Sequence, residues 1–232
     1  GHKSPAFAEA AAGQIAANLP VTVNWVRFHR NKLKPGHLLG NRFAIRITEL
    51  AVPLAEAQAR AAAVIGRLNA VGLPNYFGQQ RLGEGGANVR QGRAIVAGER
   101  SKRDRWLQRF LISAYQSYLC NRYLAQRLEL GAFDRLLAGD VAKKYATGGM
   151  FDVTDVAAEQ PRYAAQEISF TAPLYGPKLW AAKDAAGELE AAVLQAEGVT
   201  LEDFGRVHVE GTRRMGRLLP QGLAVTDEGD SL

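Results

Sequence analysis

The sequence predicts an α+β protein, because strand-like and helix-like segments share the chain. Residues 21–28 and 41–48 are strand-like, and helix-like segments begin near residues 53, 105 and 181. At 232 residues the chain can form one large domain or two small ones. Its apolar content of 47% and charged content of 22% are those of an ordinary globular protein.

The two strand predictions rest on composition and alternation. Residues 21–28 are rich in β-branched and aromatic side chains and follow Pro20. Residues 41–48 alternate, so that Phe43, Ile45 and Ile47 share one face. A basic turn over residues 29–40 separates the segments, and we expect both strands in one sheet.

Three helices are predicted from apolar periodicity. The first begins at Pro53 and ends near Gly72, the second covers about residues 105–130, and the third covers about residues 181–196. Glycine is dense between residues 72 and 92, which predicts an ordered loop, and residues 133–156 are expected to form short irregular elements. Composition changes near residues 72–74 and near Gly205 indicate candidate domain boundaries.

Positive charge is concentrated at the beginning of the chain. Residues 1–48 hold one acid, Glu9, and seven basic side chains, which accounts for the whole net charge of +6. These lie beside Trp25, Phe28 and Phe43, a combination typical of surfaces that contact phosphates and stack on bases. The alternative is a solvated basic face without a partner. The seven basic residues are Lys3, Arg27, Arg30, Lys32, Lys34, Arg42 and Arg46.

Several site classes are not indicated. No stretch approaches the ~20 apolar residues of a membrane span, and no secretory signal is recognisable, so we expect a cytoplasmic protein. The single cysteine, Cys120, excludes an internal disulfide and is expected to be a small core residue. The four histidines lack metal-ligand spacing. We therefore expect no metal site.

Three segments carry a family resemblance. Residues 71–83 read VGLPNYFGQQRLG, residues 32–43 read KLKPGHLLGNRF, and residues 111–122 read LISAYQSYLCNR. In identity, order and spacing they resemble motifs of the TruD family of tRNA pseudouridine synthases, over about residues 21–205. The NYFGxQRxG match is the most specific of the three.

The resemblance implies an enzyme that isomerises a uridine in tRNA to pseudouridine without a cofactor. It implies a partial mixed-sheet catalytic domain over residues 1–73 and 206–232, with an inserted α/β TRUD domain at 74–205. Phe43 would stack on the target uracil and Asn41 would orient the catalytic carboxylate. The candidate RNA contacts are Lys32, Lys34, Arg42, Arg46 and Arg81.

One motif of the family is missing from this sequence. Family members carry their catalytic aspartate in a G-x-K-D-[KR] motif before the Asn-x-Phe strand, whereas the first aspartate here is Asp104. We therefore expect a fragment of a longer enzyme, inactive alone, or else a truncated relative. Two alternatives remain: a non-catalytic RNA-binding protein derived from the family, and an unrelated small-molecule enzyme built around the glycine-rich residues 83–86.

Overall fold

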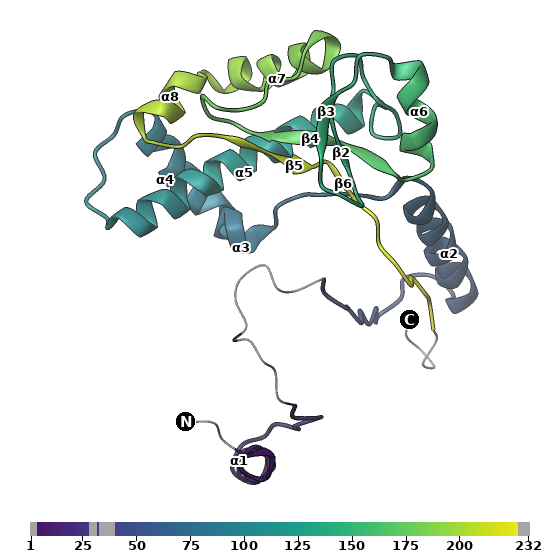
Figure 1. Cartoon of the computed structure of the whole chain (residues 1–232). Helices are drawn as coiled ribbons and strands as arrows, with labels where there is room; N and C mark the ends of the chain where they lie inside the picture. Colours follow the sequence, from purple (N-terminus) through teal and green to yellow (C-terminus); the bar gives the residue numbers. More distant parts are fainter. Residues whose placement is uncertain (1–3, 28–31, 33–39, 227–232) are drawn as a thin grey trace. The chain divides into compact units, whose positions relative to one another are not determined.

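The computed structural model describes residues 4–27, 32 and 40–226 (Figure 1). The chain separates into two compact units, Gly1–Arg46 and Ile47–Leu232. The second unit holds all the strands found among the described residues, together with all but one of their helices.

The first unit contains one helix, α1 (Pro5–Asn18). Ser4 caps it, since its hydroxyl accepts the Phe7 N–H at 3.3 Å, and Pro5 occupies the first helical position, where no amide partner is needed. Residues 21–27 and 40–48 form neither helix nor strand, so the two strand predictions are wrong for the described residues. A strand requires a partner for its backbone groups and cover for its apolar face, yet Phe43 and Ile45 are each 78% exposed.

Two antiparallel sheets form in the second unit. The larger has the order β3-β2-β4-β5, and in the smaller, two-stranded sheet β1 pairs with β6. Ala142 lies opposite Phe170, and Leu73 lies opposite Leu218 across about 145 residues of sequence. The strands are β1 (Leu73–Pro74), β2 (Val141–Lys144), β3 (Met150–Asp152), β4 (Ile168–Leu174), β5 (Thr212–Met215) and β6 (Arg217–Leu218).

Helices α5 and α6 pack against β4 of the larger sheet, and α5 also packs against α4. The three predicted helices are confirmed as α2, α5 and α7, whereas the predicted loop at 72–92 contains β1, α3 and a 3-10 turn, and ends inside α4. The irregular region 133–156 contains β2 and β3. The helices are α2 (Leu54–Val71), α3 (Gln79–Leu82), η1 (Glu84–Gly86), α4 (Ala87–Val96), α5 (Arg105–Glu129), α6 (Val156–Ala164), α7 (Asp184–Glu197) and α8 (Leu201–Arg206).

Phe170 of β4 lies at the centre of the core. Its ring meets Phe133 edge-on and lies nearly parallel to Tyr163, at centroid distances of 5.9 and 6.3 Å. A Cβ on Gly216 would come within 2.1 Å of this ring, so the chain between β5 and β6 requires glycine. Cys120 is fully buried, as predicted, and burial raises the pKa of its thiol to about 12.

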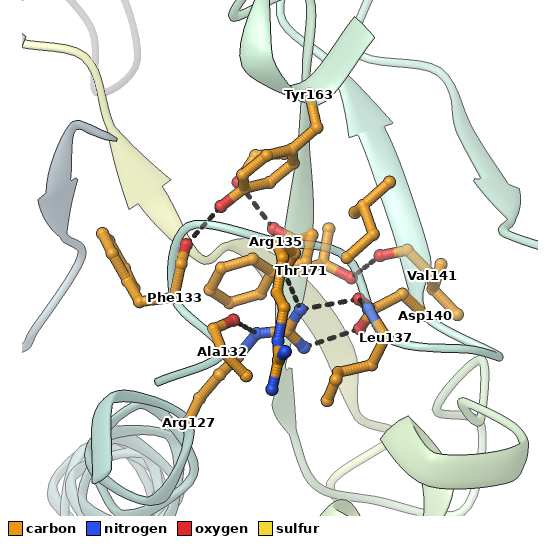
Figure 2. Close-up of polar contacts among 12 residues, drawn as sticks. Arg127, Ala132, Phe133, Arg135, Leu137, Asp140, Val141, Tyr163 and Thr171 are labelled. Atoms are coloured by element: carbon orange, nitrogen blue, oxygen red, sulfur yellow. Dashed lines mark hydrogen bonds and ion pairs between the residues drawn. The ribbon is translucent and has the colours of Figure 1, made fainter. Parts of the chain in front are cut away.

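A buried ion pair ties α5 to the loop that follows it (Figure 2). Arg127 donates to both carboxylate oxygens of Asp140, at 2.8 and 2.7 Å, and both side chains are fully buried. The same guanidinium donates to the carbonyls of Ala132 and Arg135 and lies 3.7 Å above the Phe170 ring. The pair thus fixes residues 132–140 as the entry into β2.

Of the helices in the described ranges, none combines the length and the apolar character needed to cross a bilayer.

Candidate nucleic-acid interface

The described site residues predicted in the first unit lie in segments without helix or strand. Asn41, Arg42, Phe43 and Arg46 are exposed in the segment 40–46, and Lys32 is also exposed. Lys34 lies outside the described residues. The roles of Asn41 as the orienting amide and of Phe43 as the stacking platform remain predictions.

The NYFG signature, residues 75–78, joins the chain after β1 to the last strands of the second unit. Asn75 is buried, its Nδ2 donates to the Met215 carbonyl at 2.8 Å, and its Oδ1 accepts from Arg214. Its backbone N–H donates to the Gly216 carbonyl at 3.0 Å. Asn75 therefore connects the end of β1 to the chain between β5 and β6, which explains why an asparagine is needed at this position.

Phe77 continues this connection toward α5. The Asn121 side chain accepts the Phe77 N–H and donates to the Phe77 carbonyl, both at 2.9 Å. The guanidinium of Arg214 lies 3.9 Å above the Phe77 ring. Burial first, and then the like charge of Arg81, lower the pKa of Arg214.

Arg81, the RNA contact predicted in the second unit, lies between two aromatic rings. Its guanidinium is 5.4 Å from the Phe110 centroid and 6.0 Å from that of Phe77, and it donates to the Ser113 hydroxyl at 2.9 Å. Trp106 stacks on Phe110 at 5.9 Å with an interplanar angle of 8° and is itself 74% exposed. We call the series Trp106, Phe110, Arg81, Phe77 and Arg214 the stacked ladder.

Basic side chains flank Trp106, the exposed end of the stacked ladder, in the sequence. Residues 100–109 hold five of them and one acid, Asp104, whose carboxylate caps α5 by accepting the Leu107 N–H at 2.9 Å. Cations at a helix N-terminus oppose the helix dipole and destabilise the helix slightly, so helix stability does not account for them. Several cations next to an exposed tryptophan in the sequence are typical of surfaces that contact phosphates and stack on bases. The five residues are Arg100, Lys102, Arg103, Arg105 and Arg109, all exposed.

This surface was not predicted from the sequence. A charge count over all residues after residue 48 hides the local excess at residues 100–109, because acids elsewhere in that part balance it. Trp106 falls at the start of a predicted helix and gives no separate signal there. The detectable signal is a tryptophan among five cations within ten residues.

Among the described residues, no group of three or more histidine, cysteine or acidic side chains could hold a metal ion.

Comparison with known proteins identifies the family. The family model of tRNA pseudouridine synthase D (TruD) matches residues 8–103 and 101–232, which together span nearly the whole chain. The chain belongs to this family. The resemblance of the three sequence motifs is thereby confirmed.

Individual TruD relatives extend the match. A tRNA pseudouridine synthase D of Anaeromyxobacter dehalogenans is 48% identical over 198 residues, covering 82% of this chain and 55% of the relative. The tRNA pseudouridine synthase D of Thermus thermophilus is 45% identical over 176 residues, which cover 76% of this chain and 48% of the relative. A TruD crystal structure from Methanosarcina mazei shares the fold, with a TM-score of 0.61 at 23% identity over 75% of this chain and 59% of that one. The chain thus spans about half the length of these curated relatives.

Proposed function

We propose that this chain forms part of an enzyme that isomerises a uridine in tRNA to pseudouridine. The observation that supports this most strongly is the TruD family match along nearly the whole chain, together with relatives that carry this name at 45–48% identity. The partner is tRNA and the compartment is the cytoplasm. No metal or redox cofactor takes part in the chemistry.

The reaction needs a carboxylate. The N-glycosidic bond breaks, the uracil turns, and the ring is rejoined to the sugar through carbon, with an enzyme carboxylate acting as nucleophile or base. Asp104 is the first aspartate of the chain, and its carboxylate already caps α5. We infer that the catalytic aspartate belongs to a part of the enzyme that these residues do not span, because the G-x-K-D-[KR] motif of the family is missing before Asn41 and Phe43.

The residues of the first unit supply the base-holding part of the active site. Phe43 stacks on the extruded uracil and Asn41 orients the catalytic carboxylate, while Lys32, Lys34, Arg42 and Arg46 contact phosphates. Arg81 and the rest of the stacked ladder offer a second RNA-binding surface. The exposure of Trp106 and of the five basic residues around it supports this assignment.

The insertion of a TRUD domain at 74–205 also remains a proposal, and its C-terminal boundary needs adjustment. Pairing of β1 with β6 brings the entry and exit of the second unit's core side by side, as an inserted domain requires. Gly205, however, lies within α8, and β5 belongs to the larger sheet. We therefore place the end of the domain after Leu218. Limited proteolysis should cut before Gly72 and after Leu218 and leave a protected core that contains α5.

The function is tested with the full reading frame that contains this chain, by chemical labelling and primer extension on bulk tRNA. We expect pseudouridine formation, and Phe43→Ala should reduce its rate by at least about 10²-fold with the unfolding temperature unchanged. The 232-residue chain alone should be inactive. Robust activity from that chain would mean that the active site is misassigned, and an inactive full protein that still binds tRNA would favour a non-catalytic RNA-binding protein.

A further inference from the structure

A cavity of about 530 Å³ opens in the second unit between α3, the glycine loop 83–86, α4, α5 and the end of α7. Small-molecule sites typically have volumes of about 300–1,000 Å³. Much of the wall is apolar, formed by Leu82, Val89 and the rings of Tyr115 and Tyr118. The cavity is therefore suited to one flat heterocycle with a polar substituent.

The Tyr115 hydroxyl is the feature of this cavity that packing does not explain. The residue is fully buried, and its ring stacks on Tyr118 at 6.2 Å and on Phe204 at 6.0 Å. Among the residues that the structure describes, this hydroxyl has no hydrogen-bond partner. Burial first, and then the Glu197 carboxylate, raise its pKa to about 12, so it remains a protonated donor at neutral pH. Phenylalanine would pack equally well without an unpaired hydroxyl, whereas a ligand that reaches the hydroxyl from the cavity, by moving the side chains that cover it, would supply the missing partner.

Charged groups of both signs line the same cavity. Arg90 and Arg93 lie three residues apart on α4 and so share a face. Arg93 donates to the Glu197 carbonyl at 3.3 Å, and Arg90 donates to the Gly85 carbonyl at 2.5 Å, which leaves each guanidinium with further N–H donors. One oxygen of the Glu197 carboxylate accepts from the Tyr118 hydroxyl at 2.9 Å. The cavity thus combines donors suited to a phosphate with a carboxylate that can only accept.

We propose that this cavity binds one unstacked nucleotide, whose base lies against Tyr118 and whose phosphate contacts Arg90 and Arg93. The donor edge of the base donates to the Glu197 carboxylate, and an acceptor atom of the base accepts from the Tyr115 hydroxyl. Guanine, adenine and cytosine carry an exocyclic amino group that a carboxylate accepts from well. Uracil has one N–H between two carbonyl oxygens, and these repel a carboxylate. The cavity therefore favours amino-bearing bases, which distinguishes it from the site that isomerises a uridine.

Helix α3 connects the cavity to the stacked ladder. Gln79 and Leu82 line the cavity, while Arg81 of the same helix lies between Phe77 and Phe110. An RNA strand on the stacked ladder is one source of the nucleotide, and a free nucleotide offers the same chemistry. The inference rests on the proposed function only in naming RNA as one source of the bound nucleotide.

The test compares GMP, CMP and UMP binding to the 232-residue chain by isothermal titration calorimetry, and tRNA binding by filter retention. Tyr115→Phe removes the hydroxyl and keeps the ring, Arg93→Gln removes one cation, and Arg67→Gln, on the exposed face of α2, is the control for a lost surface charge. We expect GMP and CMP to bind at least about tenfold more tightly than UMP. Tyr115→Phe and Arg93→Gln should each weaken GMP binding about tenfold, and the control should not change it. Thermal unfolding should show that Tyr115→Phe is at least as stable as the wild type.

The tRNA measurements distinguish the two sources. Weaker tRNA binding in Tyr115→Phe and Arg93→Gln, with or without measurable affinity for free nucleotides, assigns the cavity to a nucleotide of the RNA. Unchanged tRNA binding beside selective GMP binding assigns it to a free nucleotide. The proposal is overturned if neither nucleotides nor tRNA respond to the two variants, if UMP binds as tightly as GMP, or if Tyr115→Phe unfolds earlier while binding normally. None of these measurements depends on pseudouridine formation.

Discussion

The side-chain amide of Asn121 pairs with the backbone of Phe77 in both directions, with each hydrogen bond 2.9 Å long. Asn121 belongs to α5, whereas Phe77 lies in the signature segment between β1 and α3. The amide therefore takes the place of a neighbouring strand and holds Phe77 where Arg214 can lie over its ring at 3.9 Å.

Asn121→Ala should destabilise the second unit by about 1–3 kcal/mol, because it leaves the N–H and the carbonyl of Phe77 without their partners. The free energy is measured by urea unfolding, followed by circular dichroism. Asn121→Asp is the matched variant, since it keeps the acceptor for the Phe77 N–H but places a carboxylate oxygen against the Phe77 carbonyl. It should also destabilise the protein. Wild-type stability in both variants would show that the amide pairing does not hold the signature segment.

The Arg127–Asp140 pair leads to a second prediction (Figure 2). Removing one partner leaves a buried charge uncompensated, so Asp140→Ala should cost about 3–5 kcal/mol. The double variant Arg127→Met, Asp140→Leu should recover part of that loss, because the apolar pair buries no charge. The unfolding free energies of the wild type, Asp140→Ala and the double variant are compared to measure this recovery. A double variant less stable than Asp140→Ala would mean that the hydrogen bonds from Arg127 to Ala132 and Arg135 outweigh the ion pair.

Local signals explain which parts of the fold the sequence predicts. Helix α5 has a capping aspartate, an apolar stripe and no internal glycine or proline, so its boundaries are predicted within a residue. Strand β4 is buried along most of its length and reads ISFTAPL, in which apolar residues alternate with Ser169, Thr171 and Pro173, so its strand signal is present in the sequence and was missed. The segment itself does not show which strands it pairs with, because its partners are residues 142–144 and 212–215, which lie apart along the chain.

In the candidate site, too, local motifs are visible in the sequence, whereas the partners of each residue are not. The identity-rich signature at residues 75–83 identifies the family, but the pairing of Asn75 with Arg214 joins residues 139 apart. The partner of a buried amide cannot be read from spacing. Conversely, alternation at residues 41–48 predicts a strand that the described residues do not form, because a sheet partner and a covering layer decide whether an alternating segment becomes one.

The third prediction concerns acid. Lys183 donates to Asp152 at 2.6 Å and Trp180 Nε1 donates to its other oxygen at 2.7 Å, and these bonds, that from Lys183 first, lower the pKa of Asp152. A carboxyl whose folded pKa lies below its unfolded value of about 4 stabilises the fold above that pH. Its contribution is lost as pH falls through the folded pKa.

The stability advantage of the wild type over Asp152→Asn should therefore shrink between about pH 6 and pH 3. The urea unfolding midpoints of both proteins at pH 6 and at pH 3 measure this difference in stability. Lys183→Met should show the same shrinking difference, since it removes the main donor to the same carboxylate. A difference that stays constant over this pH range would exclude the ion pair as its cause.

The last prediction concerns the stacked ladder as an RNA surface. Trp106 is 74% exposed, so Trp106→Ala should leave the unfolding temperature nearly unchanged. Removing the ring on which one base stacks should weaken tRNA binding by about 1–3 kcal/mol, while Trp106→Phe should retain much of the affinity. Trp180→Ala is the control for removal of a surface tryptophan away from the stacked ladder, and it should bind tRNA normally.

The surrounding cations are tested through the salt dependence of the same binding. Replacing Lys102, Arg105 and Arg109 by alanine should flatten the log–log slope by about 0.7–0.9 for each phosphate that the protein no longer neutralises. The equivalent triple variant of Lys32, Lys34 and Arg46 tests the basic surface of the first unit in the same assay. If only that second variant changes the slope, tRNA binds the first unit alone, and the stacked ladder serves to hold the signature segment against α5. If both change it, the bound RNA contacts the two units at once, because each slope counts phosphates at its own surface.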